Sequence, residues 1–187
     1  VYGYGARDDS GEKADHLLRA APNNATVRVT LTSDGYLTGP AGVYALDIRA
    51  DALIQAAADA GLPRGSVTVQ HLAAVDYDCA CAAVAPRLGD LPDCFVCAND
   101  FMALAAVNTL TAHGISVPQQ TAVAGFDNSI FSRISPVPIT TVHQDIPELV
   151  RRTVRCLLHQ IRPDSTEPPD SLCVPVQLIP RASTIRV

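Results

Sequence analysis

Five polar or aromatic side chains in this sequence are of the types that bind a small polar molecule. Carboxylates and amides hydrogen-bond to neighbouring hydroxyl groups, an arginine donates two parallel hydrogen bonds, and an aromatic ring stacks on a sugar or a base. We expect such residues at the carboxyl ends of strands, or on helices that face those ends, where α/β sheets bind ligands. The candidates are Arg49, Tyr77, Asn99, Asp100 and Asp127.

Each candidate also has a purely structural interpretation. Asn99 and Asp100 can cap the helix that follows them, since a cap needs only a side-chain oxygen. Asp127 can belong to a turn after a strand. Arg49 can be a solvated charge on a helix, and Tyr77 can be ordinary packing. Their expected positions at one edge of a sheet favour the ligand interpretation.

Motifs of common enzyme classes are absent from the sequence. It contains no Gly-x-Ser-x-Gly, no phosphate-binding loop, no His-Glu-x-x-His and no Gly-x-Gly-x-x-Gly. The five histidines are scattered, and only His143 stands at an expected strand exit. We therefore predict a binding protein without catalytic residues, metal or cofactor. Catalytic triads are not local in sequence, so an enzyme of doubly wound fold stays open as an alternative.

The six cysteines allow two interpretations. Cys79, Cys81, Cys94 and Cys97 could supply a four-thiolate metal site, or they could be small buried residues in a reducing compartment. Cys94 and Cys97 lie an odd number of positions apart in an apolar strand, so they point to opposite faces. This spacing favours the buried interpretation, and a disulfide remains a further alternative.

The bulk composition excludes some partners. Hydrophobic residues make up 48% of the 187 residues, which predicts a packed core. The net charge is −5, and the densest basic run is Arg151, Arg152 and Arg155, so the chain lacks the positive surface of a nucleic-acid binder. No apolar run is long enough to span a bilayer. The chain starts without Met or a signal sequence and looks like a fragment.

Helical and strand patterns alternate along the sequence with short connections. This alternation predicts an α/β fold with a mainly parallel sheet and helices on both faces. Segment 33–42, rich in glycine and polar residues, is expected to be a loop. Expected strands are 27–31, 67–69, 94–98, 122–126, 139–142 and 172–179. Expected helices are a first one before Pro22, 45–60, one from Asp76 or Asp78 to Pro86, 100–113 and 146–161.

Several motifs occur in an order that is typical of one family. They are the opening Gly11, Ala14, His16 and Leu17, then Arg49, Asp76-Tyr77, the segment 98–104, Val117-Pro118, the segments 123–128 and 138–144, and the closing Arg181, Ser183 and Thr184. Together they resemble the effector-binding domain of LacI/GalR-type bacterial transcription regulators. The resemblance implies that Arg49 contacts an effector and that the ring of Tyr77 lines its pocket.

The resemblance also implies a periplasmic-binding-protein-like fold of two lobes. Residues 1–7 would be a remnant of the N-terminal lobe, and 8–140 the C-terminal effector-binding lobe. Residues 141–187 would hold the crossover, a helix that packs on the N-terminal lobe and the final strand. Within the crossover, Thr141 and Gln144 are the proposed hinge residues.

The function that the resemblance implies is ligand sensing in a cytoplasmic DNA-binding regulator, a repressor. Its partners would be a sugar or similar small polar effector, a second copy bound through the helices near Asp78 and Asp100, and operator DNA. The DNA would be contacted by a headpiece absent from this chain, and no membrane is involved. A periplasmic sugar-binding protein of an ABC transporter shares the fold and is the alternative.

The sequence departs from the family at a few positions. Gly39-Pro40 comes later than the Gly-Pro that usually follows the first strand, and Ala52 and Leu53 replace a glycine and an aromatic residue. Asp78 replaces the hydroxyl residue after the pocket aromatic, and Asn128 replaces a second aspartate. These departures concern the identity of the effector rather than the fold.

Overall fold

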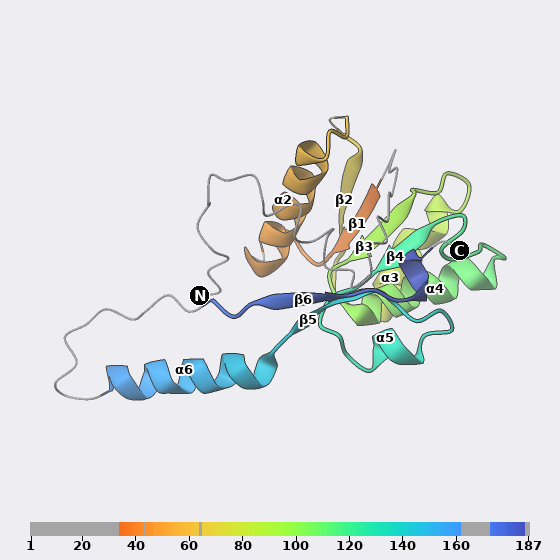
Figure 1. The fold of residues 1–187 in the computed structure, drawn as a ribbon. Helices are drawn as coiled ribbons and strands as arrows, with labels where there is room; N and C mark the ends of the chain where they lie inside the picture. The colour runs from red at the N-terminus through yellow and green to blue at the C-terminus, as the bar shows by residue number, and fades with distance from the viewer. Residues whose placement is uncertain (1–33, 43, 64, 162–172, 186–187) are drawn as a thin grey trace.

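The computed structural model has at its centre a parallel sheet of four strands in the order β2-β1-β3-β4 (Figure 1). These strands are β1 (Asp34–Thr38), β2 (Val67–His71), β3 (Cys94–Cys97) and β4 (Ala122–Ala124). The predicted α/β class with a mainly parallel sheet is confirmed. The structure describes residues 34–42, 44–63, 65–161 and 173–185.

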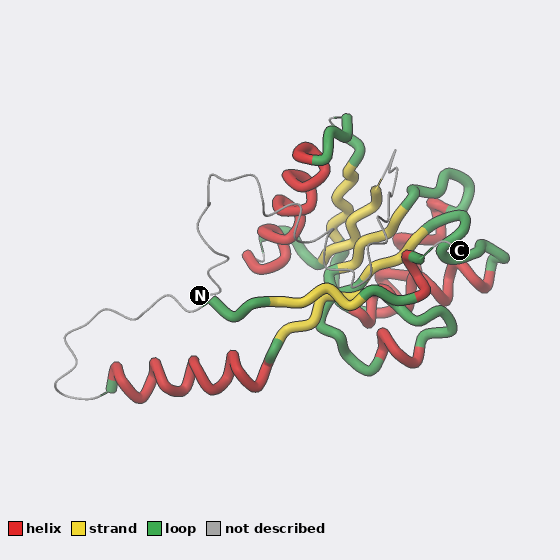
Figure 2. Tube along the Cα trace, viewed as in Figure 1, coloured by secondary structure: helices red, strands yellow, loops and turns green. Residues whose placement is uncertain are grey.

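Three helices cover the two faces of this sheet: α2 (Tyr44–Asp59), α3 (Tyr77–Val84) and α4 (Asp100–Ala112). Helix α2 contacts β1 and β2, whereas α4 contacts β3 and β4 and packs along α3. The chain moves sideways from β1 to β2 and then back across to β3. Right-handed crossovers in these opposite directions place α2 on one face, and α3 and α4 on the other (Figure 2).

Side-chain caps fix where the helices begin. Asp76 accepts a hydrogen bond from the amide of Cys79 at 2.7 Å, which decides between the two expected caps of α3. Asn99 accepts one from the amide of Met102 at 2.8 Å and starts α4. Gly114, with φ of +74°, follows the end of α4 in the left-handed conformation that glycine adopts without strain.

Strand β1 corrects the expectation for residues 33–42, because the segment predicted as a loop forms a central strand. Gly35 suggested a turn, but the ring of Phe95 lies 3.2 Å from where its Cβ would be, so the small residue serves packing. Tyr36, Leu37 and Thr38 are buried between β2 and β3. Gly39-Pro40 therefore follows the strand directly, as in the family. The helix before Pro22 and the strand at 27–31 lie outside the described residues.

Helix α4 is buried on nearly every side. The side chains of Met102, Ala105, Val107 and Leu110 are 0% exposed, because the sheet covers one side of the helix and α3 another. Most of the apolar surface of α4 is thus covered within the lobe, and whether its outer face also contacts a second copy stays a prediction.

Two antiparallel strands, β5 (Thr141–Gln144) and β6 (Val176–Ile179), form a second sheet beside the first. β5 leads into helix α6 (Ile146–Gln160), which extends away from the four-stranded sheet (Figure 1). A short helix α5 (Phe131–Ile134) precedes β5, and the 3-10 helices Ala85–Arg87 and Ala182–Thr184 complete the described elements.

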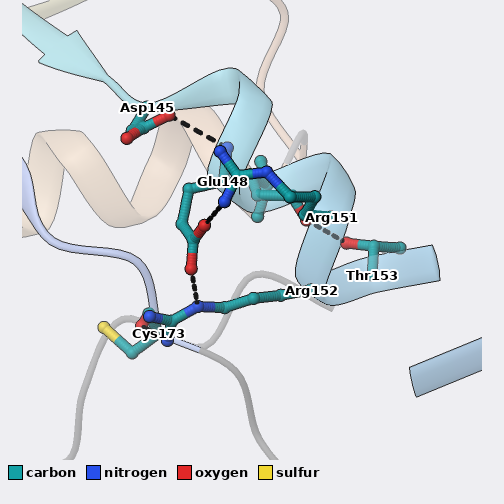
Figure 3. Close-up of polar contacts among 7 residues, drawn as sticks. Asp145, Glu148, Arg151, Arg152, Thr153 and Cys173 are labelled. Atoms are coloured by element: carbon teal, nitrogen blue, oxygen red, sulfur yellow. Dashed lines mark hydrogen bonds and ion pairs between the residues drawn. The ribbon is translucent and has the colours of Figure 1, made fainter. Parts of the chain in front are cut away.

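Polar contacts hold the first turns of α6 (Figure 3). Asp145 caps the helix by accepting a hydrogen bond from the amide of Glu148 at 2.9 Å. The Glu148 carboxylate pairs with Arg151 and accepts a 2.6 Å hydrogen bond from Arg152. Arg152 also donates to the carbonyl of Cys173 at 3.3 Å, which ties the helix to the chain before β6.

The opposite side of α6 is an exposed apolar stripe. Ile146, Val150, Val154, Leu157 and Ile161 recur at helical spacing, and none of the helix's residues is buried. A helix with one apolar face is normally stabilised by packing that face against another surface.

Gly125, directly after β4, is required by the close approach of α4. A methyl group there would overlap Asp100 Oδ1 and lie 3.1 Å from the Asp100 Cα and 3.2 Å from the Ala103 Cβ. We predict that Gly125→Ala lowers the free energy of unfolding by about 1–3 kcal/mol, the usual range for overpacking. Gly89→Ala is the control, since its methyl group would meet open space. Equal denaturation midpoints for the two variants would contradict this packing account.

Candidate functional site

The candidate site lies at the carboxyl ends of the central strands. Helices leave β1 and β3 toward opposite faces of the sheet, and such a switch point leaves a crevice where α/β folds bind ligands. Arg49, on α2, reaches across this point, and its Nη1 donates to the carbonyl of Ala98, just after β3, at 2.9 Å. Arg49 therefore lies at the carboxyl end of β3, and its contact with an effector stays a prediction.

The Arg49 guanidinium is held flat against an aromatic ring. Its Cζ lies 3.7 Å from the centroid of Phe126, a cation–π contact. Its Nε is buried and has no hydrogen-bond partner among the described residues. A buried donor of this kind is costly to leave unpaired.

Asp127 follows Phe126 and lies at the same edge. Its backbone amide donates to the carbonyl of Val142 at 2.9 Å, and its Oδ1 accepts from Gln144 Nε2 at 2.9 Å. Loss of surrounding water raises the pKa of this carboxyl, and the charge of nearby Arg49 only partly opposes the rise. Arg49, Phe126, Asp127 and Gln144, here named the Arg49 cluster, thus present a cation, a carboxylate and an amide together.

Asp100 takes a different role from the one expected. The residue is only 1% exposed. Its Oδ2 accepts from the amide and the hydroxyl of Ser129 at 2.6 and 3.0 Å, and its Oδ1 accepts from the Thr141 hydroxyl at 2.6 Å. Both oxygens are already used, so direct effector contact by Asp100 is corrected to a positioning role. Asp100, Ser129 and Thr141 are here named the Asp100 network.

The structure does not bring Asn99 and Tyr77 into the Arg49 cluster. Asn99 Oδ1 is used by the helix cap, which matches its structural interpretation. The Tyr77 hydroxyl accepts from Asn108 Nδ2 at 2.8 Å. Its ring lies 5.6 Å from that of Phe101, which in turn lies 4.8 Å from Phe131. Among the described contacts, none joins Tyr77 to Arg49 or Asp127, so its role as a pocket wall stays a prediction.

The two proposed hinge residues differ in their surroundings. Thr141 is fully buried, donates to Asp100 and accepts from the Asn128 amide at 3.1 Å, so it anchors β5 to the lobe. Gln144, at the other end of β5, is held at its side chain by the hydrogen bond that it donates to Asp127. Any pivot must therefore lie after Thr141, nearer to Gln144 and the start of α6.

Sequence reasoning missed Arg181 and its neighbours as parts of this site. Arg181 Nη2 donates to Asn128 Oδ1 at 2.6 Å, and its Nη1 donates to the Ile139 carbonyl at 2.8 Å. Ser183 is buried, donates to the Val123 carbonyl and accepts from the Thr140 amide. Residues 181–184, grouped with the crossover, thus pack on the lobe that contains β4. The available signal was the closing motif that contains Arg181 and Ser183.

The cysteines show no chemistry of their own. Cys94 and Cys97 are buried in β3, and burial raises the pKa of the Cys97 thiol. None of the six cysteines is in a disulfide, and within residues 34–161 and 173–185, as far as described, no group of three metal-ligating side chains occurs. In the same part of the chain, no helix is both long and apolar enough to cross a membrane.

The fold and the site define a ligand-binding domain of known type. Residues 24–184 match a family model described as a periplasmic binding protein-like domain. The match covers most of the chain, which therefore belongs to the periplasmic binding protein-like family.

Individual relatives narrow the family further. A stretch of 72 residues is 40% identical to the HTH-type transcriptional repressor PurR of Haemophilus influenzae, strain PittEE, and covers 38% of this chain and 21% of the repressor. A stretch of 85 residues is 39% identical to PurR of Mannheimia succiniciproducens and covers 46% of this chain and 25% of that repressor. The matched stretches thus span a quarter or less of these relatives.

Solved structures agree with these relatives. The transcriptional regulator CelR, solved in complex with cellobiose, is 27% identical in sequence to this chain, with a TM-score of 0.75. The match covers 92% of this chain and 51% of the CelR chain. A LacI family regulator from Burkholderia phymatum is 26% identical to this chain, with a TM-score of 0.72. The match covers 94% of this chain and 61% of the regulator's chain. Within its family the chain is thus an effector-binding domain of the LacI/GalR type.

The raised pKa of Asp127 predicts how this residue affects stability. Folding favours the protonated carboxyl, so stability falls as pH rises from the unfolded to the folded pKa and stays lower above both. We predict that Asp127→Asn, which can still accept from Gln144, raises the melting temperature at pH 7. This gain in melting temperature should vanish at a pH below the pKa of Asp127 in both the unfolded and the folded state.

The control for this prediction is Asp90→Asn, because the Asp90 side chain is 94% exposed and pairs weakly with Arg87. It should change the stability by no more than about 0.5 kcal/mol. A melting temperature of Asp127→Asn that equals or falls below the wild-type value at pH 7 would contradict the sign of the effect.

Proposed function

We propose that this chain is the ligand-sensing part of a DNA-binding transcriptional regulator that acts as a repressor. The observation that carries the proposal is the Arg49 cluster at the switch point of the sheet. It combines a stacked guanidinium with an unpaired buried donor and a partly desolvated carboxylate. This arrangement is built to bind a molecule that offers both hydrogen-bond donors and acceptors, rather than to carry out catalysis.

The proposed effector is a sugar or a similar small polar molecule. Asp127 can accept hydrogen bonds from hydroxyl groups of the ligand, and Arg49 can donate to a ligand oxygen. The Phe126 ring, which lies under the Arg49 guanidinium, restricts the movement of the Arg49 side chain. The similar CelR structure is a complex with cellobiose, which supports the sugar-like class. Tyr77 and its aromatic neighbours remain the proposed apolar wall.

The proposed response runs through β5. Asp127 Oδ1 is bonded to Gln144, and β5 continues through Asp145 directly into α6. A ligand hydroxyl that takes this oxygen releases Gln144 from the lobe, so ligand binding favours a different position of α6. Such coupling requires that the ligand bind one arrangement more tightly than the other.

The exposed stripe of α6 supports the proposed domain organisation. An apolar face without a partner among the described residues is expected to be covered by the N-terminal lobe, so that the cleft lies between two lobes. We further propose a cytoplasmic homodimer that binds operator DNA through a headpiece outside this chain. The outer faces of α3 and α4, with the groove lined by Cys81, Ala85 and Ala112, would form the dimer contact.

A transporter-associated periplasmic sugar-binding protein is the less favoured alternative. It shares the fold, but the curated relatives reported above are repressors. Effector-dependent binding of the full-length protein to operator DNA would support the regulator, whereas ligand binding without any DNA binding would support the transporter protein.

The test of the ligand site is a thermal-shift screen of the full-length protein with cellobiose, monosaccharides and purine bases. A ligand at about 100 times its Kd stabilises a protein by about 2.7 kcal/mol. We predict that Arg49→Ala weakens binding of any hit by roughly 10- to 100-fold, since hydrogen bonds to charged groups contribute about 1.5–3 kcal/mol.

The matched control for this screen is Arg133→Ala, which removes an exposed arginine from α5. It should leave the affinity unchanged. An Arg49→Ala protein that folds normally and binds the hit as tightly as wild type would refute the site assignment.

A further inference from the structure

Two successive residues of the site hold an unusual backbone conformation. Asp127 has φ of +102° and Asn128 has φ of +52°, although neither is glycine. Positive φ brings the Cβ of an L-residue too close to its own backbone and costs roughly 1–2 kcal/mol for each residue. The turn that presents Asp127 must therefore be held by contacts from outside it.

Asn128 is held through its backbone amide and both ends of its side chain. Its backbone amide donates to Thr141 Oγ1 at 3.1 Å, its Oδ1 accepts from Arg181 Nη2 at 2.6 Å, and its Nδ2 lies 3.3 Å from His143 Nδ1. An arginine can only donate, so the amide oxygen of Asn128 must face Arg181. The amide NH₂ then faces His143, whose Nδ1 serves as the acceptor.

Arg181 is itself rigidly held by the segment that carries it. Its backbone amide donates to Thr140 Oγ1 at 2.8 Å, and its Nη1 donates to the carbonyl of Ile139 at 2.8 Å. Two residues later, Ser183 is buried and bridges Thr140 and Val123. The guanidinium thus joins the chain before β5 to the turn after β4, and it reaches the turn from 53 residues further along the sequence.

We propose that Arg181 is a positioning residue that locks Asn128 in the left-handed conformation and thereby aims the Asp127 carboxylate at the ligand edge. Arg181 need not touch the ligand, because it acts through the backbone that Asn128 shares with Asp127. The importance of this for effector binding rests on the proposed function, whereas the effect on Asp127 does not.

Two explanations of Arg181 predict opposite changes at Asp127. If Arg181 acted only as a nearby positive charge, its removal would raise the pKa of the Asp127 carboxyl. If it positions the turn, its removal lets the carboxyl leave its present surroundings, whose net effect is to raise the pKa, so the pKa falls toward that of a free aspartate.

The experiment follows the carbon-13 shift of the Asp127 carboxyl with pH in the full chain, by NMR, without ligand. One variant is Arg181→Gln, which removes both the positive charge and the planar pair of guanidinium donors. The other is Arg181→Lys, which keeps the charge but lacks the planar guanidinium that donates to Ile139 and Asn128 at the same time. Both should lower the pKa of Asp127, and the amide exchange of Asn128 should rise about tenfold or more. Arg133→Gln, an exposed charge loss, should change neither.

A pKa of Asp127 that stays unchanged or rises in folded Arg181→Lys overturns the proposal. Should the Arg181 variants fail to fold, Asn128→Ala removes the acceptor and leaves Arg181 in place, and the same fall is required of it. These measurements need no effector. A failed ligand screen would therefore reject the proposed function without affecting the role of Arg181 at Asp127. An unchanged pKa of Asp127 would reject the role of Arg181 without affecting the proposed function.

Discussion

The buried carboxylate of Asp100 constrains much of the structure around it. A charged group that is 1% exposed must have its oxygens fully hydrogen-bonded, and Asp100 achieves this with donors from two distant segments. Ser129 supplies an amide and a hydroxyl, and Thr141 supplies a second hydroxyl. Asp100 also stands in the first turn of α4, where the helix dipole favours a negative charge.

Several residues of the sequence motifs follow from this one requirement. Gly125 must lack a side chain because the backbone passes against Asp100. Thr141 must carry a hydroxyl, which also accepts from Asn128 and so fixes the turn beside Asp127. The supports are buried and satisfied, while Asp127 is exposed, strained and partly desolvated. Backbone strain is thus concentrated at Asp127 and Asn128, in the turn that carries the proposed ligand-binding carboxylate.

β5 links this buried centre to helix α6, the element that the proposed response would move. Its first residue, Thr141, is hydrogen-bonded to Asp100, and its last residue, Gln144, is hydrogen-bonded to Asp127, the proposed ligand-binding carboxylate. Helix α6 begins two residues later, and its apolar stripe is exposed. The proposed response therefore needs only a short path from Asp127 through Gln144 to α6.

Much of the fold could be predicted from the sequence, because helix caps and apolar periodicity are local. Asn99 and the apolar run after it determined α4, and Pro147 marked the start of α6. β1 could not be recognised, since Gly35 serves a contact with distant Phe95. For the same reason the roles of Asp100 and Arg181 were missed or misjudged, because their partners lie 29 to 53 residues away.

The most direct test of this account is a double-mutant cycle between Asp100→Asn and Thr141→Val, measured as free energies of unfolding. The NH₂ group of an asparagine at position 100 would face either the Ser129 donors or the Thr141 hydroxyl, so one of these hydrogen bonds is already lost. Removal of the Thr141 hydroxyl should therefore lower the free energy of unfolding less in Asp100→Asn than in the wild type. We predict a coupling of at least about 1 kcal/mol. Thr121→Val, which removes a buried hydroxyl bonded to Pro92 instead, should be additive with Asp100→Asn. Additive effects of Asp100→Asn and Thr141→Val would contradict the central role of the buried carboxylate.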